Sequence, residues 1–115
     1  DSVAKASSDG YPPYNIEQIG ESGLRITVAV AGFRRADLDI QVEDNQLLIR
    51  GKQPEEDAER VFLHRGIAGR QFQRRFVLAE GIEVRDAALE NGLLHVDLLR
   101  TVPETRVRTI DIKGN

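Results

Sequence analysis

The sequence VRDAALENGLLHVDLL occupies residues 84–99 and consists of two apolar segments joined by Asn91 and Gly92. Both joining residues tolerate positive φ angles, which the tightest β-hairpin turns require. Residues 84–89 and 93–99 are therefore predicted to be neighbouring antiparallel strands.

The rest of the chain repeats this pattern of short segments separated by turn residues. Leu38, Ile40 and Val42 alternate with polar side chains, which is typical of a strand with one buried and one solvated face. Asp44 and Asn45 then provide a turn, and no stretch has a sustained 3.6-residue period. The expected strands are residues 14–19, 24–30, 38–43, 47–51, 60–65, 71–78, 84–89 and 93–99. This arrangement predicts an all-β fold, an antiparallel immunoglobulin-like β-sandwich.

One predicted strand, residues 71–78, has an unusual apolar face. Alternation places Phe72, Arg74, Phe76 and Leu78 on the same side of it. An arginine between two phenylalanines is expected to be half-buried and paired, because an unpaired buried charge is costly. The alternative is an ordinary surface arginine.

Composition narrows the possible function classes. The chain has 115 residues, 40% of them hydrophobic and 30% charged, and a net charge of −3, which fits one domain with tails. Its 16 basic residues are dispersed, so we expect no nucleic-acid partner. The absence of cysteine excludes disulfides and thiolate chemistry. Its most apolar stretch, residues 24–33, is too short to span a membrane, so we expect a soluble protein with no membrane partner.

Residues for catalysis or metal binding are few. The two histidines, His64 and His95, are expected on the surface, and the carboxylates at residues 55–57 are expected to solvate a loop. The glycine pairs at residues 20–23 and 66–69 are predicted turns rather than phosphate loops. We therefore expect no catalytic, cofactor or metal site.

Several stretches resemble the small heat shock protein family, whose conserved unit is the α-crystallin domain. Residues 87–94 (AALENGLL) are similar to the family's A-x-x-x-N-G-x-L signature, and residues 72–78 to its F-x-R-x-F-x-L strand. Ile110-Asp111-Ile112 resembles its C-terminal I-x-I anchor, and residues 30–33 (VAGF) its apolar-Gly-Phe turn. Within the family, the likeness is greatest to bacterial inclusion-body-binding proteins. One departure is Ala79, which stands where many members have proline.

The resemblance implies a domain organisation. Residues 1–10 are expected to be a flexible lead-in and residues 11–101 the α-crystallin domain. A protruding dimerisation arm is expected at about 53–66, and residues 102–115 form a tail with the anchor. The chain begins at Asp1 rather than Met, so we expect a trimmed N-terminus that lacks the family's N-terminal arm and loses part of client binding and assembly.

The resemblance also implies assembly sites. The arm of one copy is expected to pair with the first strand of another. That dimer interface would include Tyr14, Ile16, Arg60, Val61, Phe62, Leu63 and Arg74. The alternative is an ordinary hairpin within one chain. The tail residues Ile110 and Ile112 are expected to fill a groove between the family's fourth and eighth strands, here Leu38, Ile40, Val42, Val84, Ala87 and Leu89.

The function implied is that of an ATP-independent holdase. It would bind partly unfolded proteins, prevent their aggregation, and act as a dimeric building block of larger cytoplasmic oligomers. Refolding would be left to ATP-driven chaperones. Open alternatives are a co-chaperone-type β-sandwich that binds a folded chaperone partner and, more distantly, a carbohydrate-binding sandwich or a hydrolase.

Overall fold

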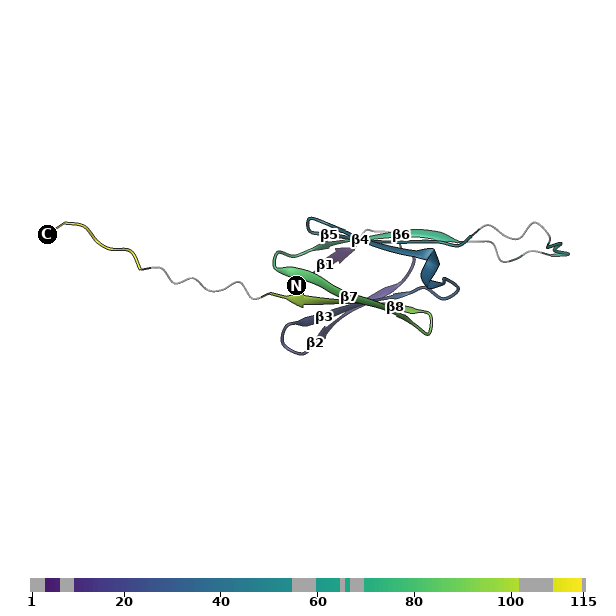
Figure 1. Cartoon of the computed structure of the whole chain (residues 1–115), viewed down its shortest axis with the longest axis horizontal. Coiled ribbons are helices and arrows are strands. Elements are labelled where there is room, and N and C mark those ends of the chain that lie inside the picture. Colours follow the sequence, from purple (N-terminus) through teal and green to yellow (C-terminus); the bar gives the residue numbers. More distant parts are fainter. Residues whose placement is uncertain are drawn as a thin grey trace.

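Two four-stranded antiparallel sheets pack face to face (Figure 1). The computed structural model describes residues 4–6, 10–54, 60–64, 66, 70–101 and 109–114. The first sheet has the strand order β1-β6-β5-β4, and the second has the order β2-β3-β8-β7. The antiparallel β-sandwich predicted from the sequence is confirmed.

The strand bounds follow the alternating segments closely. In chain order they are β1 Ala4–Ala6, β2 Tyr14–Ile19, β3 Gly23–Ala29, β4 Leu38–Glu43, β5 Gln46–Lys52, β6 Gln71–Leu78, β7 Ile82–Glu90 and β8 Leu93–Arg100. A short 3-10 helix, η1 (Arg35–Asp37), precedes β4. Within the described part of the chain, no helix is long and apolar enough to cross a membrane.

The core lies between the two sheets and is built from alternate residues of the central strands. Ile26, Val28, Ile49, Phe76 and Val96 each have at most 1% of their surface exposed. In β6, alternate residues are buried over the whole strand, as the pattern of the sequence predicts. Burial of this size is the main stabilising contribution to a small β-sandwich.

The β7–β8 hairpin forms at the predicted turn. Asn91 and Gly92 have φ angles of 52° and 77°, and Glu90 lies opposite Leu93 across the ladder. This two-residue turn sets the register of both strands, so it decides which side chains enter the core.

Two segments differ from the sequence prediction. Arg60–His64 are not in a strand, although residues 60–65 were expected to form one; Arg65 lies outside the described residues. Conversely, Ala4–Ala6 form β1 and pair with Phe76–Leu78 of β6, although residues 1–10 were expected to be a flexible lead-in. A strand needs a neighbour that satisfies its backbone groups. The edge of β6 that β5 leaves open provides one for β1, whereas no strand of the described residues pairs with Arg60–His64. Residues 1–3, 7–9 and 102–108 lie outside the described part of the chain.

Candidate functional site

An open groove separates the edge strands of the two sheets. Its volume is about 460 Å³, and its lining comes from β4, β7, β8 and η1. The lining residues are Arg35, Leu38, Asp39, Ile40, Ala87, Ala88, Leu89 and Leu94. β4 and β7 are each the outermost strand of their sheet within the described residues. An extended peptide in this groove would therefore meet apolar side chains and free strand edges together.

A β-bulge in β7 directs side chains toward this groove. Val84 lies opposite Leu98 and Asp86 opposite Asp97, so Arg85 is the extra residue. The insertion shifts the alternation by one position. Ala87 consequently faces the same side as Val84, which plain alternation would not allow.

Four of the six residues predicted for the groove line it. These are Leu38, Ile40, Ala87 and Leu89, whereas Val42 and Val84 are not among the lining residues. Val84 packs against the core, and Val42, on the strand that lines the groove, is 52% exposed. The sequence analysis missed four lining residues, Arg35, Asp39, Ala88 and Leu94. Leu94 pairs with Leu89 across the hairpin, so counting back from the Asn91-Gly92 turn would have found it.

The predicted anchor residues make little contact with the sandwich of their own chain. Ile110 is 62% exposed and Ile112 is 95% exposed. Figure 1 shows their segment, residues 109–114 in yellow, away from both sheets. Large aliphatic side chains exposed to this extent mark an interaction segment when they occur together.

The arm residues are similarly exposed. Val61 is 88% exposed and Leu63 fully exposed, while Phe62 is 43% exposed with the Arg60 guanidinium 5.9 Å from its ring centroid. These residues lie beyond the end of the sandwich, where β5 ends and β6 begins (Figure 1). The structure thus places a second apolar segment outside the core of the single chain.

Tyr14, Ile16 and Arg74 connect β2 to the opposite sheet. β2 is an edge strand within the described residues, and both Tyr14 and Ile16 are partly buried against the core. Arg74 is only 3% exposed, and its guanidinium lies 4.7 Å from the centroid of the Tyr14 ring, which also meets Phe76 edge-on. The alternative of a surface arginine is therefore wrong. A cation held against an aromatic face is partly compensated for its lost hydration.

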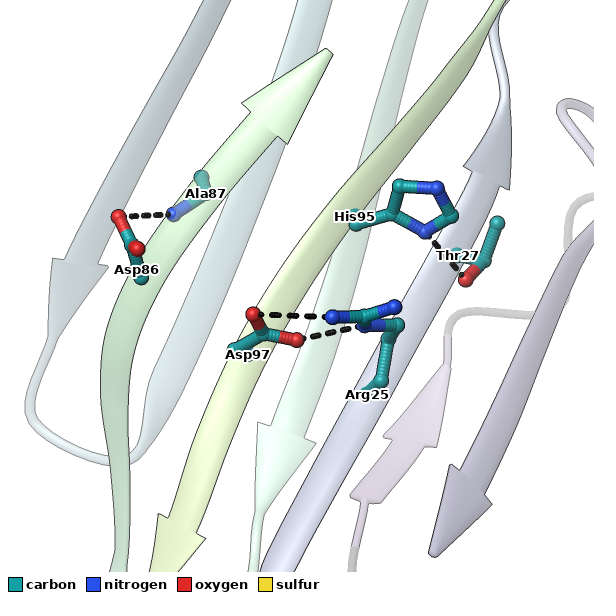
Figure 2. A network of polar contacts seen from close by, with 6 residues as sticks. All are labelled: Arg25, Thr27, Asp86, Ala87, His95 and Asp97. Atoms are coloured by element: carbon teal, nitrogen blue, oxygen red, sulfur yellow. Dashed lines mark hydrogen bonds and ion pairs between the residues drawn. The ribbon is translucent and has the colours of Figure 1, made fainter. Parts of the chain in front are cut away.

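A polar network covers the outer face of the second sheet (Figure 2). Arg25 donates to both carboxylate oxygens of Asp97, at 2.7 and 3.3 Å. The Thr27 hydroxyl lies 3.0 Å from His95 Nδ1. His95 is thus a half-buried, hydrogen-bonded side chain on the outer face, while His64 is exposed.

This network does not have the order of a catalytic relay. Asp97 binds Arg25 rather than His95, and the imidazole Nδ1 lies against the Thr27 hydroxyl instead of a carboxylate. Within the described part of the chain, no group of three or more His, Asp or Glu side chains is placed to hold a metal ion.

Comparison with known proteins assigns the family. The model of the Hsp20/alpha crystallin family matches residues 17–113. The small heat shock protein IbpA of Serratia proteamaculans is 52% identical over 105 residues, covering 90% of this chain and 77% of its own. IbpA of Yersinia pestis is 50% identical over 108 residues, covering 93% and 79%. The chain belongs to the Hsp20/alpha crystallin family.

Solved structures agree with this assignment. Small heat shock protein AgsA from Salmonella typhimurium superposes with a TM-score of 0.69 at 33% identity, over 90% of this chain and all of that one. The small heat shock protein of Synechococcus phage S-ShM2 gives 0.65 at 32% identity with the same coverage. The likeness to inclusion-body-binding proteins, expected from the sequence, is confirmed by the IbpA relatives.

Membership in the Hsp20/alpha crystallin family decides between the functions left open by the sequence. The family consists of chaperones, and this chain is an ATP-independent holdase and a building block of oligomers. The co-chaperone-type sandwich, the carbohydrate-binding sandwich and the hydrolase are no longer needed to account for the sequence.

Proposed function

We propose that the groove between β4 and β7 is the site where this holdase exchanges its own tail for client segments. Ile110-Asp111-Ile112 of another copy would occupy the groove at rest. The observation that supports this most is the coexistence of an open apolar groove, lined by Leu38, Ile40 and Leu89, with an unburied tail that carries two isoleucines. In an extended chain, residues two apart project to the same side, so both isoleucines can enter together.

Small side chains leave space in one wall of the groove. Ala87 and Ala88 line it beside Leu89, so branched side chains can enter without displacing the core. Burial of both isoleucines would stabilise the docked tail by about 3–6 kcal/mol before ordering costs. The net gain is smaller, so the tail can leave and a client segment can replace it by mass action.

We propose further that two copies form a dimer by exchanging arms. Residues Arg60–Leu63 of one copy would pair with the β2 edge near Tyr14 and Ile16 of the other. Such pairing would add backbone hydrogen bonds between the two segments and would bury Val61 and Leu63. Arg74 would then lie close to the interface, because its guanidinium already contacts Tyr14 on β2.

The chain would work in the bacterial cytoplasm without enzymatic activity and without a nucleic-acid or membrane partner. It would hold partly unfolded clients until ATP-driven chaperones refold them, because reversible binding by itself lowers the concentration of free aggregating chain but does no work on it.

A substitution in the groove tests the proposal. Ala87→Arg places a long cation in the groove at an exposed position. It should abolish suppression of light scattering by a thermally aggregating client, measured without nucleotide, and reduce oligomer size. Ala36→Arg makes the same change at an exposed alanine of η1 that does not line the groove. Equal suppression by the Ala87→Arg variant and the wild type would reject the groove as the client site.

A further inference from the structure

The root of the arm is fastened by one glutamine. The backbone N–H of Gln53 donates to the Arg70 carbonyl at 3.0 Å, and its side-chain oxygen accepts from the Arg70 N–H at 2.8 Å. Its side-chain nitrogen donates to the Gly32 carbonyl at 2.8 Å. Gln53 therefore joins the two ends of the arm to each other and to the turn after β3.

Gly32 gives this contact the room it needs. Its φ of 92° lies in a region that residues with a side chain rarely adopt. A Cβ at this position would lie 3.2 Å from the Gln53 side-chain nitrogen. The absence of a Cβ at Gly32 thus leaves room for the Gln53 amide to reach the Gly32 carbonyl.

The other end of the arm contacts the segment that leads into β2. The Arg70 guanidinium lies 5.8 Å from the centroid of the Tyr11 ring, and its Nη1 is 3.5 Å from the Tyr11 hydroxyl. Tyr11 in turn meets Phe72 edge-on, and Phe72 meets Phe33 in the same way. The arm root is consequently packed on both sides, against the Gly32 turn and against the start of the edge that the dimer proposal assigns to a partner's arm.

We infer that Gln53 is a positioning residue that fixes the direction in which the arm leaves the sandwich. The inference rests on the proposed exchange of arms. An arm held in one direction is always ready to pair with a partner. An arm that is free to pivot has the orientation required for pairing only part of the time. Apparent affinity falls in proportion to that competent fraction. Gln53 thus acts on the association step, through the arm, without touching the partner.

Three substitutions of Gln53 separate the effect of its two side-chain hydrogen bonds from the effect of its side-chain volume. Gln53→Ala removes the side chain, and Gln53→Met keeps its length without strong hydrogen-bonding groups. Gln53→Glu keeps an acceptor for the Arg70 N–H but loses the donor to Gly32. We expect Gln53→Ala and Gln53→Met to weaken the dimer by about fivefold to tenfold, and Gln53→Glu by less, because each neutral hydrogen bond makes a modest net contribution.

The rate constants are the deciding measurement. Chains with donor and acceptor fluorophores, followed after mixing and after dilution, give the association and dissociation rates of the dimer. Slower association at an unchanged dissociation rate, with unchanged methyl chemical shifts of Ile49 and Val96 in the core, is the expected result for Gln53→Ala. The matched control is Gln73→Ala, because Gln73 is an exposed glutamine on β6 with no side-chain hydrogen bond in the described part of the chain.

Replacement of both Val61 and Leu63 by aspartate distinguishes a failure of the Gln53 inference from a failure of the arm-exchange proposal. If this double substitution weakens the dimer but Gln53→Ala leaves association within twofold of the wild type, arm exchange holds and the role of Gln53 is overturned. The role is also overturned if Gln73→Ala slows association as much as Gln53→Ala. If the double aspartate variant dimerises like the wild type, the arm proposal itself is wrong.

Discussion

The interior of the sandwich and the two outlying segments, the arm and the tail, use the same aliphatic side chains in opposite ways. Ile49 and Val96 are fully buried, whereas Leu63 is fully exposed and Ile112 is 95% exposed. The interior side chains bury one another within a single chain, because alternation on facing strands brings them together. The exposed aliphatic side chains of the arm and the tail lie outside that interior. The contrast teaches that the aliphatic residues that make this molecule fold are separate from the exposed ones to which we assign assembly.

The largest expected effect is on the folding side of this comparison. Phe76 is fully buried and meets Tyr14 edge-on with ring centroids 5.1 Å apart. Phe76→Ala should lower the free energy of unfolding by about 3–5 kcal/mol, since it removes a large buried side chain and leaves a cavity. Urea denaturation at one fixed protein concentration measures this loss, because assembly makes stability depend on concentration. A loss below about 1 kcal/mol would contradict the placement of Phe76 in the core.

The second effect lies on the assembly side. Replacement of Val61 and Leu63 together by alanine should weaken the dimer by about a hundredfold, because their burial against a partner would be lost. The fold should be unaffected, since both side chains are already solvated in the single chain. Sedimentation velocity over a range of concentrations gives the dimer affinity, and far-ultraviolet circular dichroism reports the fold. A collapse of the circular dichroism signal would mean that the arm belongs to the core after all.

The third effect should separate the tail from the arm. Ile112→Ala removes one anchor side chain, and we expect it to shift assemblies toward dimers, at a cost of about 1–2 kcal/mol per docked tail. Size-exclusion chromatography with light scattering measures the distribution. Lys113→Ala, a change at the neighbouring exposed residue, should leave it unaltered. Dissociation to monomers would assign the tail to the dimer interface instead of the groove.

The folding half of the molecule could be predicted from the sequence because its signals are local. The Asn91-Gly92 turn fixes one register, and period-two alternation then assigns buried residues such as Phe72 and Leu94 to the inner face. Asp44, at a φ of 53°, likewise turns the chain between β4 and β5 where the Asx pair predicts it. Each of these inferences needs only the neighbouring residues in the sequence.

The groove and the arm were harder to predict, for two physical reasons. The bulge at Arg85 lets Ala87 face the same side as Val84. No residue type signals a bulge there, so alternation along β7 could not have placed Ala87, and the groove residues were predicted from the family resemblance instead. Residues 60–64 have a strand-like composition, but strand formation depends on a neighbouring strand, and none of the described residues pairs with them in this way. For the same reason the alanine-rich β1 was missed, since it exists through the edge of β6.

The smallest expected effect concerns the outer face of the second sheet, which belongs to neither the core nor the assembly surfaces. Asp97 raises the pKa of Arg25 above its ordinary value through a hydrogen bond and its charge. An interaction that raises the pKa of a cation stabilises the folded state while the cation is charged, and this contribution is lost only as the pH rises through the raised pKa. Arg25 therefore adds no pH dependence between pH 5 and 9. Asp97→Asn should lower the urea midpoint slightly at low ionic strength, because it replaces a charged partner with a neutral one.

Salt distinguishes an ion pair from a packing effect at this site. At about 1 M salt the screening length is about 3 Å, so the difference between Asp97→Asn and the wild type should largely disappear.

Asp86 is the matched control. It lies opposite Asp97 on β7, and its carboxylate accepts a hydrogen bond from the Ala87 N–H. Asp86→Asn keeps the Arg25 pair and relieves the repulsion between two like charges, so it should not lower the midpoint. A loss for Asp97→Asn that persists at high salt would mean that Asp97 orders the strands by its hydrogen-bond geometry. The outer face would then contribute to folding alongside the interior.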